Sequence, residues 1–114
     1  AGVLRDQGRL AEAEVLERER LAAKRAEGGD RHPSTLGALN NLADNLRAQG
    51  KLAEAEPLLR EALAARREVS GNDDKQTINA TGNLGKVLLA QGKLAEAEPL
   101  LVEAVAWYRK TSGF

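Results

Sequence analysis

The sequence Gln-Gly-Lys-Leu-Ala-Glu-Ala-Glu-Pro-Leu begins at Gln49 and occurs again, unchanged, at Gln91. A related stretch, Gln-Gly-Arg-Leu-Ala-Glu-Ala-Glu, begins at Gln7, so the three copies are spaced 42 residues apart. From Gln49 and Gln91 onward, 17 of 24 aligned residues are identical, which is far above chance. A fixed period of about 20 to 50 residues is typical of proteins built from stacked structural repeats. The sequence therefore predicts a repeat architecture.

The first half of the central unit has the periodicity of a helix over residues 34–49. Pro33 suits the first helical turn, where a missing N–H costs nothing. Ser34 or Thr35 could instead cap this end. Gly50 is expected to end the helix in a left-handed conformation. The apolar residues recur at spacings of three and four, which is one helical face, and they are Leu36, Leu39, Leu42, Ala43 and Leu46.

The second half of the unit predicts a helix over residues 52–69. Pro57 would cost this helix one backbone hydrogen bond, and its recurrence at Pro99 indicates that the architecture tolerates it. The next unit repeats the pattern and predicts helices over residues 76–91 and 94–110. The expected apolar stripe of the helix over 52–69 consists of Leu52, Ala55, Leu58, Leu59, Ala62, Leu63 and Ala65 or Arg66.

The N-terminal unit is expected to be partial. Residues 1–7 resemble the tail of a first helix, and residues 10–27 predict a complete second helix. We therefore expect one repeat domain over residues 1–114, with units at about 1–29 (partial), 30–71 and 72–114. Such a chain resembles an excerpt from a longer array, and its uncapped ends make self-association possible.

Two local departures from the repeat pattern affect the expected packing. Glu17 and Arg20 occupy positions that Leu59 and Ala62 fill one period later, so the N-terminal unit is either degenerate or shifted, with Leu16 and Leu21 forming its core. The helix over 76–91 contains both Gly82 and Gly85. Each mid-helix glycine costs up to about 1 kcal/mol relative to alanine, so we expect this helix to be the softest.

The composition excludes several functional classes. The 17 basic and 17 acidic residues cancel, so nothing in the net charge favours nucleic acid or an anionic membrane. The chain has no cysteine and one histidine, which leaves no basis for a disulfide, a thiol nucleophile or a metal site. No apolar run approaches the roughly 20 residues that a membrane span needs. We expect neither a metal nor a cofactor.

No catalytic arrangement is evident either. His32 has no serine or cysteine at a motif spacing, and we interpret it as a loop histidine that helps to set a helix start. The repeated Glu-x-Glu pairs are interpreted as acidic residues that complement the dipole of a first helical turn, and they are Glu12, Glu14, Glu54, Glu56, Glu96 and Glu98. Arg18 and Arg60 follow Glu14 and Glu56 by four residues and can pair with them. We therefore expect no enzyme activity.

The central unit combines small residues at Ala43, Gly50, Ala55 and Ala62 with larger ones at Leu39, Leu42, Leu46 and Leu59. The next unit has Gly85, Gly92, Ala97 and Ala104, with Leu84, Leu88 and Leu101. His32-Pro33 and Leu39-Asn40-Asn41-Leu42-Ala43 precede and open the first helix of the central unit. In these features the chain resembles the tetratricopeptide repeat family, and in particular the 42-residue subtype found in kinesin light chains.

The resemblance implies an all-α, right-handed α-solenoid of antiparallel helix pairs, about two and a half repeats long. It implies a protein–protein interaction module in the cytoplasm or elsewhere inside the cell, which binds an extended peptide or partner segment in a concave groove. The alternative is a structural scaffold or assembly subunit that associates through its ends and outer helices without a peptide ligand. Neither alternative involves nucleic acid or insertion into a membrane.

In this family the first helices of the repeats line the groove. Asn41 and Asn83 are one period apart and are expected on one face, where an asparagine can donate to and accept from a peptide backbone. Alternatively, they only bond neighbouring helices. Further candidates on or beside that face are Asn40, Asp44, Arg47, Asn79 and Lys86. Trp107 and Tyr108 are either packing residues against a next helix or exposed interface anchors.

Overall fold

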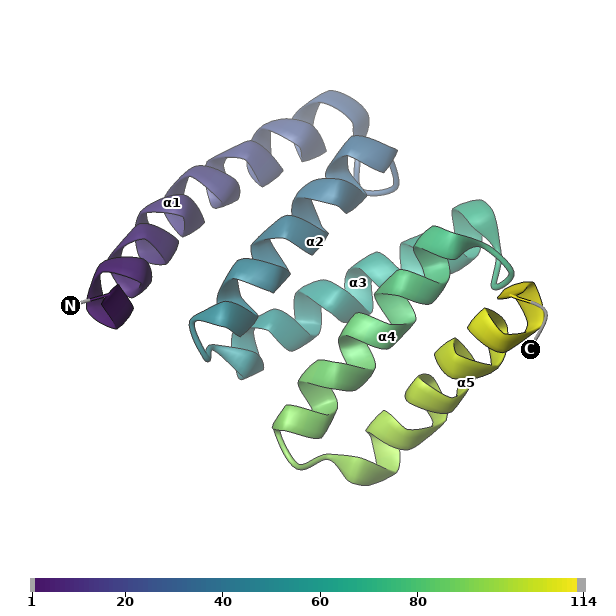
Figure 1. Ribbon diagram of the computed structural model, residues 1–114. Helices are drawn as coiled ribbons and strands as arrows, with labels where there is room; N and C mark the ends of the chain where they lie inside the picture. The colour runs from purple at the N-terminus through teal and green to yellow at the C-terminus, as the bar shows by residue number, and fades with distance from the viewer. Residues whose placement is uncertain (1, 113–114) are drawn as a thin grey trace.

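The computed structural model describes the backbone of residues 2–112 and the side chains of residues 8–111. The helices in chain order are α1 (Gly2–Gly28), α2 (Pro33–Ala48), α3 (Leu52–Ser70), α4 (Lys75–Ala90) and α5 (Leu94–Ser112). No strand occurs within residues 2–112. Each helix packs against the next in the sequence, so the helices follow one another from α1 at one edge of the molecule to α5 at the other (Figure 1). The prediction of an all-α helical solenoid is confirmed.

Two glycines end the first helices of the complete units as predicted. Gly50 and Gly92 have φ angles of +83° and +82°. The N–H of Lys51 donates to the Leu46 carbonyl at 2.8 Å, and the N–H of Lys93 donates to Leu88 at 2.9 Å. This hydrogen bond across a left-handed glycine belongs to the Schellman motif, which satisfies carbonyl groups at a helix end. It also turns the chain tightly into the following helix.

The start of α2 confirms Pro33 in the first helical turn and His32 as a residue that sets the helix start, and it rules out the alternative of a Ser34 or Thr35 cap. His32 is the capping residue, and its Nδ1 accepts a hydrogen bond from the Ser34 N–H at 3.1 Å. Thr35 is fully buried, and its hydroxyl donates to the Gly29 carbonyl at 2.7 Å, which anchors the preceding loop. The start of α4 uses Asp74 instead, whose carboxylate accepts from the Gln76 N–H at 2.9 Å. Histidine and aspartate thus satisfy the same orphan donors.

The core lies between successive helices and is aliphatic. Its largest fully buried side chains in α2 are Leu36, Leu39, Leu42 and Leu46. Pro57 and Pro99 lie inside α3 and α5, and both helices continue through them. Ala65 is buried and Arg66 is only half-buried, so Ala65 is the residue that completes the apolar stripe of α3. The predicted helix pairs therefore form with their apolar faces inward.

The N-terminal unit does not contain the break around Gly8 that the two predicted segments, residues 1–7 and 10–27, imply. Helix α1 runs without interruption through this residue, and Gly8 does not have the positive φ of Gly50 and Gly92. Residue 1 of the predicted first segment lies outside the described residues. At Gly50 and Gly92 a 16-residue helix comes before the turn, whereas only seven residues precede Gly8. Such a short segment is a poor helix by itself, and a continuous α1 pairs its backbone groups within one helix.

The core of this N-terminal unit is shifted only in part. Leu21 is buried, as one of the two sequence interpretations required, whereas Leu16 is 63% exposed and that part of the prediction is wrong. Arg20 is exposed. Glu17 is half-buried and accepts a hydrogen bond from the Asn45 amide at 2.6 Å. The charged residue is therefore accommodated by a polar partner on α2.

The two glycines within α4 have different surroundings. A β-carbon at Gly85 would lie 2.8 Å from Cδ2 of Leu101, closer than real contacts allow, so this glycine lets α5 approach α4. A β-carbon at Gly82 would meet only the Ala104 β-carbon, at 3.8 Å. Thr81, at the position of Leu39, is fully buried, and its hydroxyl donates to the Thr77 carbonyl at 2.9 Å. Of the two glycines within α4, only Gly85 is therefore required for the close packing of α5.

Candidate functional site

A hollow of about 560 Å³ lies between α2, α3, α4 and α5. Five of the seven residues predicted to contact a peptide line it, namely Asn40, Asn41, Asn79, Asn83 and Lys86. These residues come from α2 and α4, the first helices of the two complete units. We call this hollow the groove.

Asn41 and Asn83 differ in how they use their amides. Asn41 is exposed, and no partner for its amide is found among residues 8–111. Asn83 is half-buried, and its Nδ2 donates to Oδ1 of Asn40 across the two helices at 3.2 Å. Asn83 therefore has the helix-bonding role that the sequence left open as an alternative, while it also lines the groove. Asn41 keeps both its donor and its acceptor available.

The remaining two predicted residues, Asp44 and Arg47, pair with each other. The Arg47 guanidinium lies 2.6 Å from the Asp44 carboxylate, and both side chains are exposed. They line a small hollow beside the groove that also borders Asn40 and Asn83. The structure thus places this pair next to the groove, with its charges mutually compensated.

Trp107 and Tyr108 are adjacent in sequence but lie in different hollows. Their rings meet edge to face with centroids 5.3 Å apart. The Tyr108 hydroxyl donates to Oδ1 of Asn79 at 2.7 Å, and Tyr108 lines the groove. Trp107 Nε1 donates to Asp73 at 2.6 Å in a separate hollow, so it contacts the preceding loop. Whether Trp107 also packs against a next helix stays a prediction.

The groove has an apolar floor and a basic rim. Its lining includes the buried side chains Leu36 and Ile78, and its charged members are Arg66 and Lys86. Arg66 was not predicted as a groove residue, although it stands 42 residues before Tyr108 and so occupies the same repeat position. Amide groups, an apolar floor and two cations suit the binding of a peptide chain.

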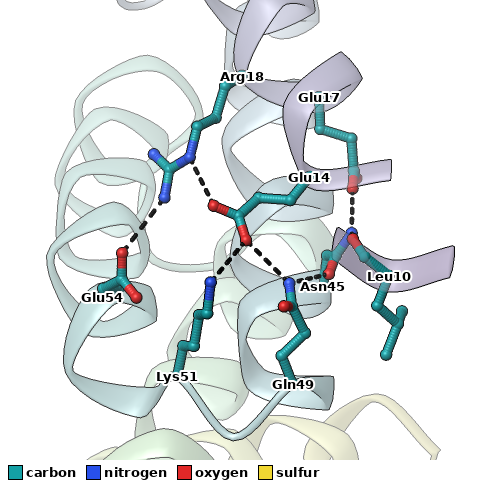
Figure 2. Close-up of polar contacts among 8 residues, drawn as sticks. All are labelled: Leu10, Glu14, Glu17, Arg18, Asn45, Gln49, Lys51 and Glu54. Atoms are coloured by element: carbon teal, nitrogen blue, oxygen red, sulfur yellow. Dashed lines mark hydrogen bonds and ion pairs between the residues drawn. The ribbon is translucent and has the colours of Figure 1, made fainter. Parts of the chain in front are cut away.

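A second feature, which the sequence analysis did not foresee, joins one repeat to the next. The Glu14 carboxylate of α1 accepts three hydrogen bonds: from Arg18 at 2.8 Å, from Gln49 at 3.0 Å and from Lys51 at 3.1 Å (Figure 2). Gln49 and Lys51 both donate to Oε1, whereas Arg18 donates to Oε2. We call Glu14 and these donors the Glu14 cluster.

The same arrangement recurs one period later as the Glu56 cluster. Glu56 accepts from Arg60 at 2.8 Å, from Gln91 at 2.8 Å and from Lys93 at 2.9 Å. Again the glutamine and the lysine share Oε1. The sequence did carry a signal for these clusters, because every donor except the arginine belongs to the stretch that begins at each Gln-Gly.

The clusters shift the ionisation of both carboxyl groups. Hydrogen bonds from Arg18, Gln49 and Lys51 lower the pKa of Glu14 from 4.5 to about 2. Hydrogen bonds from Lys93, Gln91 and Arg60 lower the pKa of Glu56 to the same value. A hydrogen bond to the charged form of an acid stabilises that form. Both carboxylates are therefore ionised at neutral pH.

The earlier interpretation of the Glu-x-Glu pairs needs correction at four residues, because Glu56 and Glu98 lie beyond the first turns of α3 and α5. Glu54 and Glu96 do lie in first helical turns. Glu12 and Glu14 lie well inside α1, which begins at Gly2, so no first-turn dipole acts on them. Glu56 is mainly the acceptor of its cluster. The predicted pairing of Glu14 with Arg18 and of Glu56 with Arg60 is confirmed.

Basic residues near the helix ends are paired across repeats as well. Arg25 of α1 makes two hydrogen bonds with Glu61 of α3, at 2.6 and 3.0 Å, and a third with Asp30 at 2.6 Å. These carboxylates raise the pKa of the Arg25 guanidinium. Arg67 contacts Glu103 in the same way at 3.2 Å. These arginines hold neighbouring second helices together.

The described residues also bear on metal binding and on membrane insertion. No group of three histidine, aspartate or glutamate side chains there could hold a metal ion. None of the helices described has the length and apolarity required to cross a membrane.

Comparison with known proteins agrees with this geometry. The family model described as Tetratricopeptide repeat matches residues 1–68 and 34–110. Two crystal structures of nearly identical TPR-like repeats from a candidate kinesin light chain of Podosopora anserina, one of them carrying a point substitution, superpose with a TM-score of 0.87 at 28% identity. The match covers 94% of this chain and 51% or 52% of those chains.

A further structure shares the fold. BtubC (BKLC) from P. vanneervenii has a TM-score of 0.61 at 17% identity, over 94% of this chain and 59% of that one. The chain thus spans little more than half the length of these three structures. No curated protein matches the sequence. Because the family model covers nearly all of it, the chain belongs to the tetratricopeptide repeat family, and its repeats are similar to those of kinesin light chains.

Proposed function

We propose that this chain is a non-catalytic protein–protein interaction module that works inside the cell and holds an extended peptide in the groove. Repeats of this family mediate protein–protein interactions, which sets the class of function. The observation that carries the finer proposal is the exposed Asn41 amide, which faces the same hollow as Asn83 and Asn79. Such amides can bond the backbone of a peptide without reading its sequence.

The rigidity of the groove supports the same proposal. Its walls are helices fixed by the aliphatic core and by the two glutamate clusters, so little ordering entropy is lost when a ligand binds. The floor includes Leu36 and Ile78, which can be covered by apolar ligand side chains. Arg66 and Lys86 at the rim can orient polar groups of the ligand. A rigid apolar trough with polar edges suits a partner segment that is extended.

The test is selection from an unbiased peptide library, followed by titration of the selected peptides. Because no intramolecular partner of the Asn41 amide is found among the described residues, Asn41→Ala should weaken binding at least several-fold at unchanged helicity and unchanged melting. Asn41→Ala/Asn83→Ala should weaken it further. Asn72→Ala, in the loop before α4, is the matched control and should bind normally. Selected peptides that bind both asparagine variants as tightly as the native chain would contradict the proposal that the groove binds the peptide.

The second candidate function is a scaffold that assembles through its ends. The observation in its favour is the exposed apolar side chains of the two edge helices. Val15 and Leu16 of α1 are 59% and 63% exposed, and Leu94 and Val102 of α5 are 60% and 58% exposed. Sedimentation of the chain over a range of concentrations distinguishes the two functions. A mass that rises with concentration and falls to that of a monomer in Val102→Lys, together with no selected peptide, would favour the scaffold.

A further inference from the structure

The side-chain amide of Asn79 is held in one orientation by a tyrosine of the next helix. Oδ1 of Asn79 accepts a hydrogen bond from the Tyr108 hydroxyl at 2.7 Å, and no other hydrogen bond of this amide is found within residues 8–111. An amide turned the other way would have to use the phenolic oxygen as its acceptor, which is weaker because its lone pair is shared with the ring. Asn79 is exposed and lines the groove, so its Nδ2 is the atom that remains to donate to a ligand.

Tyr108 is itself fixed by the residue that precedes it. Its ring meets the ring of Trp107 edge to face, with 5.3 Å between the centroids. Trp107 Nε1 donates to the carboxylate of Asp73 at 2.6 Å, which ties this part of α5 to the loop before α4. The hydroxyl that orients Asn79 is therefore anchored from outside the groove.

The pair of Asn79 and Tyr108 is peculiar to the second complete unit. Gly37 and Arg66 stand 42 residues before them, and all four residues line the groove. Residue 37 has no side chain, and yet α2 packs against α3 as α4 packs against α5. Packing of the helix pair thus does not require an amide at this position, and the Asn79 amide is available to serve the groove.

A second contact fixes two more amides of the groove. Nδ2 of Asn83 donates to Oδ1 of Asn40 at 3.2 Å. This bond leaves Oδ1 of Asn83 as an acceptor for a ligand. Asn79 and Asn83 are four residues apart on α4, which is about 6 Å along a helix. An extended peptide presents main-chain groups to one side at every second residue, about 6.7 Å apart, so a donor and an acceptor at this spacing match one edge of such a peptide.

From these contacts we propose that Tyr108 is a positioning residue of the groove, which holds Asn79 so that its Nδ2 binds a main-chain carbonyl oxygen of the peptide. Asn83 then accepts a main-chain N–H two residues away. The inference rests on the proposed function and adds the hydrogen-bond polarity with which the groove meets its ligand. A peptide that placed an N–H group at Asn79 would be rejected, because a donor would face a donor.

The first test changes the polarity of the site without changing its shape. The probe is the tightest-binding peptide selected from the library, labelled with fluorescein and titrated by fluorescence anisotropy. Asn79→Asp keeps an acceptor for the Tyr108 hydroxyl but removes the donor, and it should weaken binding about tenfold or more. Asn72→Asp makes the same change of charge in the loop before α4 and should leave the affinity unchanged. Binding by Asn79→Asp as tight as that of the native chain would overturn the inference.

The second test isolates the role of the tyrosine hydroxyl. Tyr108→Phe keeps the ring against Trp107 and removes only the hydroxyl. Each amide of the probe is replaced in turn by a thioamide, whose sulfur accepts hydrogen bonds poorly, and by an ester, which lacks the N–H. One thioamide should weaken binding to the native chain about fivefold and should have no effect on binding to Asn79→Ala.

In Tyr108→Phe the effect of this thioamide should fall to about half or less, because the freed amide of Asn79 can turn over. The effect of the ester at the N–H that faces Asn83 should persist. A general loosening of the groove would reduce the thioamide effect and the ester effect alike. That result, or an unchanged thioamide effect, would overturn the positioning role of Tyr108.

The outcomes also separate this inference from the proposed function. If the library yields no peptide, or if Asn41→Ala binds the selected peptide normally, the proposed function fails and the inference fails with it. If Asn41→Ala weakens binding while Asn79→Asp and Tyr108→Phe behave as the native chain does, the groove still binds a peptide and only the proposed polarity is wrong.

Discussion

The interface between α1 and α2 and the interface between α3 and α4 contain the same glutamate cluster but different interiors. Beside the Glu14 cluster, the amide of Asn45 donates to Glu17 at 2.6 Å and to the Leu10 carbonyl at 2.9 Å. One period later the corresponding positions hold Val87 and Leu59, which are 0% and 2% exposed. One interface is therefore partly polar inside and the other is aliphatic.

This difference shows how a repeat can tolerate a charge at a packing position. Glu17 stands where Leu59 packs one period later, and it is stable there because residue 45 is an asparagine. A polar group out of water is costly when unpaired and nearly neutral when paired. The departure at Glu17 is thus one half of a compensated pair. Either half alone should be harmful.

The largest expected effect comes from placing an asparagine, the equivalent of Asn45, in the aliphatic interface between α3 and α4. Val87→Asn buries an amide opposite Leu59, where no acceptor equivalent to Glu17 exists. We expect a loss of about 2 to 4 kcal/mol in the free energy of unfolding. Urea unfolding followed by circular dichroism measures it. Val105→Asn, at an exposed position of α5, should cost little. Equal losses of stability in Val87→Asn and Val105→Asn would contradict this prediction, because they would show that the interior of the α3–α4 interface tolerates an unpaired amide as well as an exposed position does.

The next largest effect comes from giving the α1–α2 interface the aliphatic residues of the α3–α4 interface. Asn45→Val and Glu17→Leu should each cost about 1 to 3 kcal/mol, because each leaves one polar partner unsatisfied. The double variant should recover to within about 1 kcal/mol of the native chain, since it recreates the aliphatic pair. The same urea titration gives the coupling energy of the cycle. Additive losses would mean that the two residues do not compensate each other.

Helices α2 and α4 offer a further comparison, in which the two expected effects have opposite signs. Ala43 of α2 corresponds to Gly85 of α4, where a β-carbon would lie 2.8 Å from Leu101. We expect Gly85→Ala to destabilise the protein by about 1 to 3 kcal/mol through overpacking. Gly82→Ala should stabilise it by about 0.5 to 1 kcal/mol through helix propensity. Hydrogen exchange in α4 measures both, and similar signs for the two would show that propensity rather than packing controls this helix.

The fold could be predicted because its determinants are local or periodic. Gly50 and Gly92 ended helices as their sequence context indicated, and the spacing of Leu36, Leu39 and Leu42 defined a buried face. The prediction at Gly8 was wrong although its flanking residues are nearly identical to those at Gly50. A left-handed glycine ends a helix only where the preceding segment can pack as a helix of its own. That packing depends on tertiary contacts, which the residues around the glycine do not show.

For the candidate site, the sequence could predict which residues occupy equivalent positions of the repeat, but it could not predict which side chains meet across helices. The 42-residue period predicted that Asn41 and Asn83 share one face, and both line the groove. It did not reveal that Asn83 bonds Asn40, because this contact joins two helices whose separation the sequence does not give. The Glu14 cluster was missed for the same reason. Arg18 was predicted as a partner, but the glutamine and lysine donors are 35 and 37 residues away and meet Glu14 only when repeats stack.

The smallest expected effect tests whether the two clusters are equivalent despite their different surroundings. The pKa of Glu14 and of Glu56 is about 2 in the folded chain against an ordinary 4.5. A lowered folded pKa contributes stability that is complete above about pH 4.5 and is lost as the pH falls towards 2. Urea unfolding at several pH values should therefore show a decline across this window. Glu14→Gln and Glu56→Gln should each flatten it by the same amount, whereas Glu12→Gln, exposed on α1, should leave it unchanged. Unequal flattening would mean that the polar Asn45 neighbourhood, rather than the shared donors, sets the strength of the first cluster.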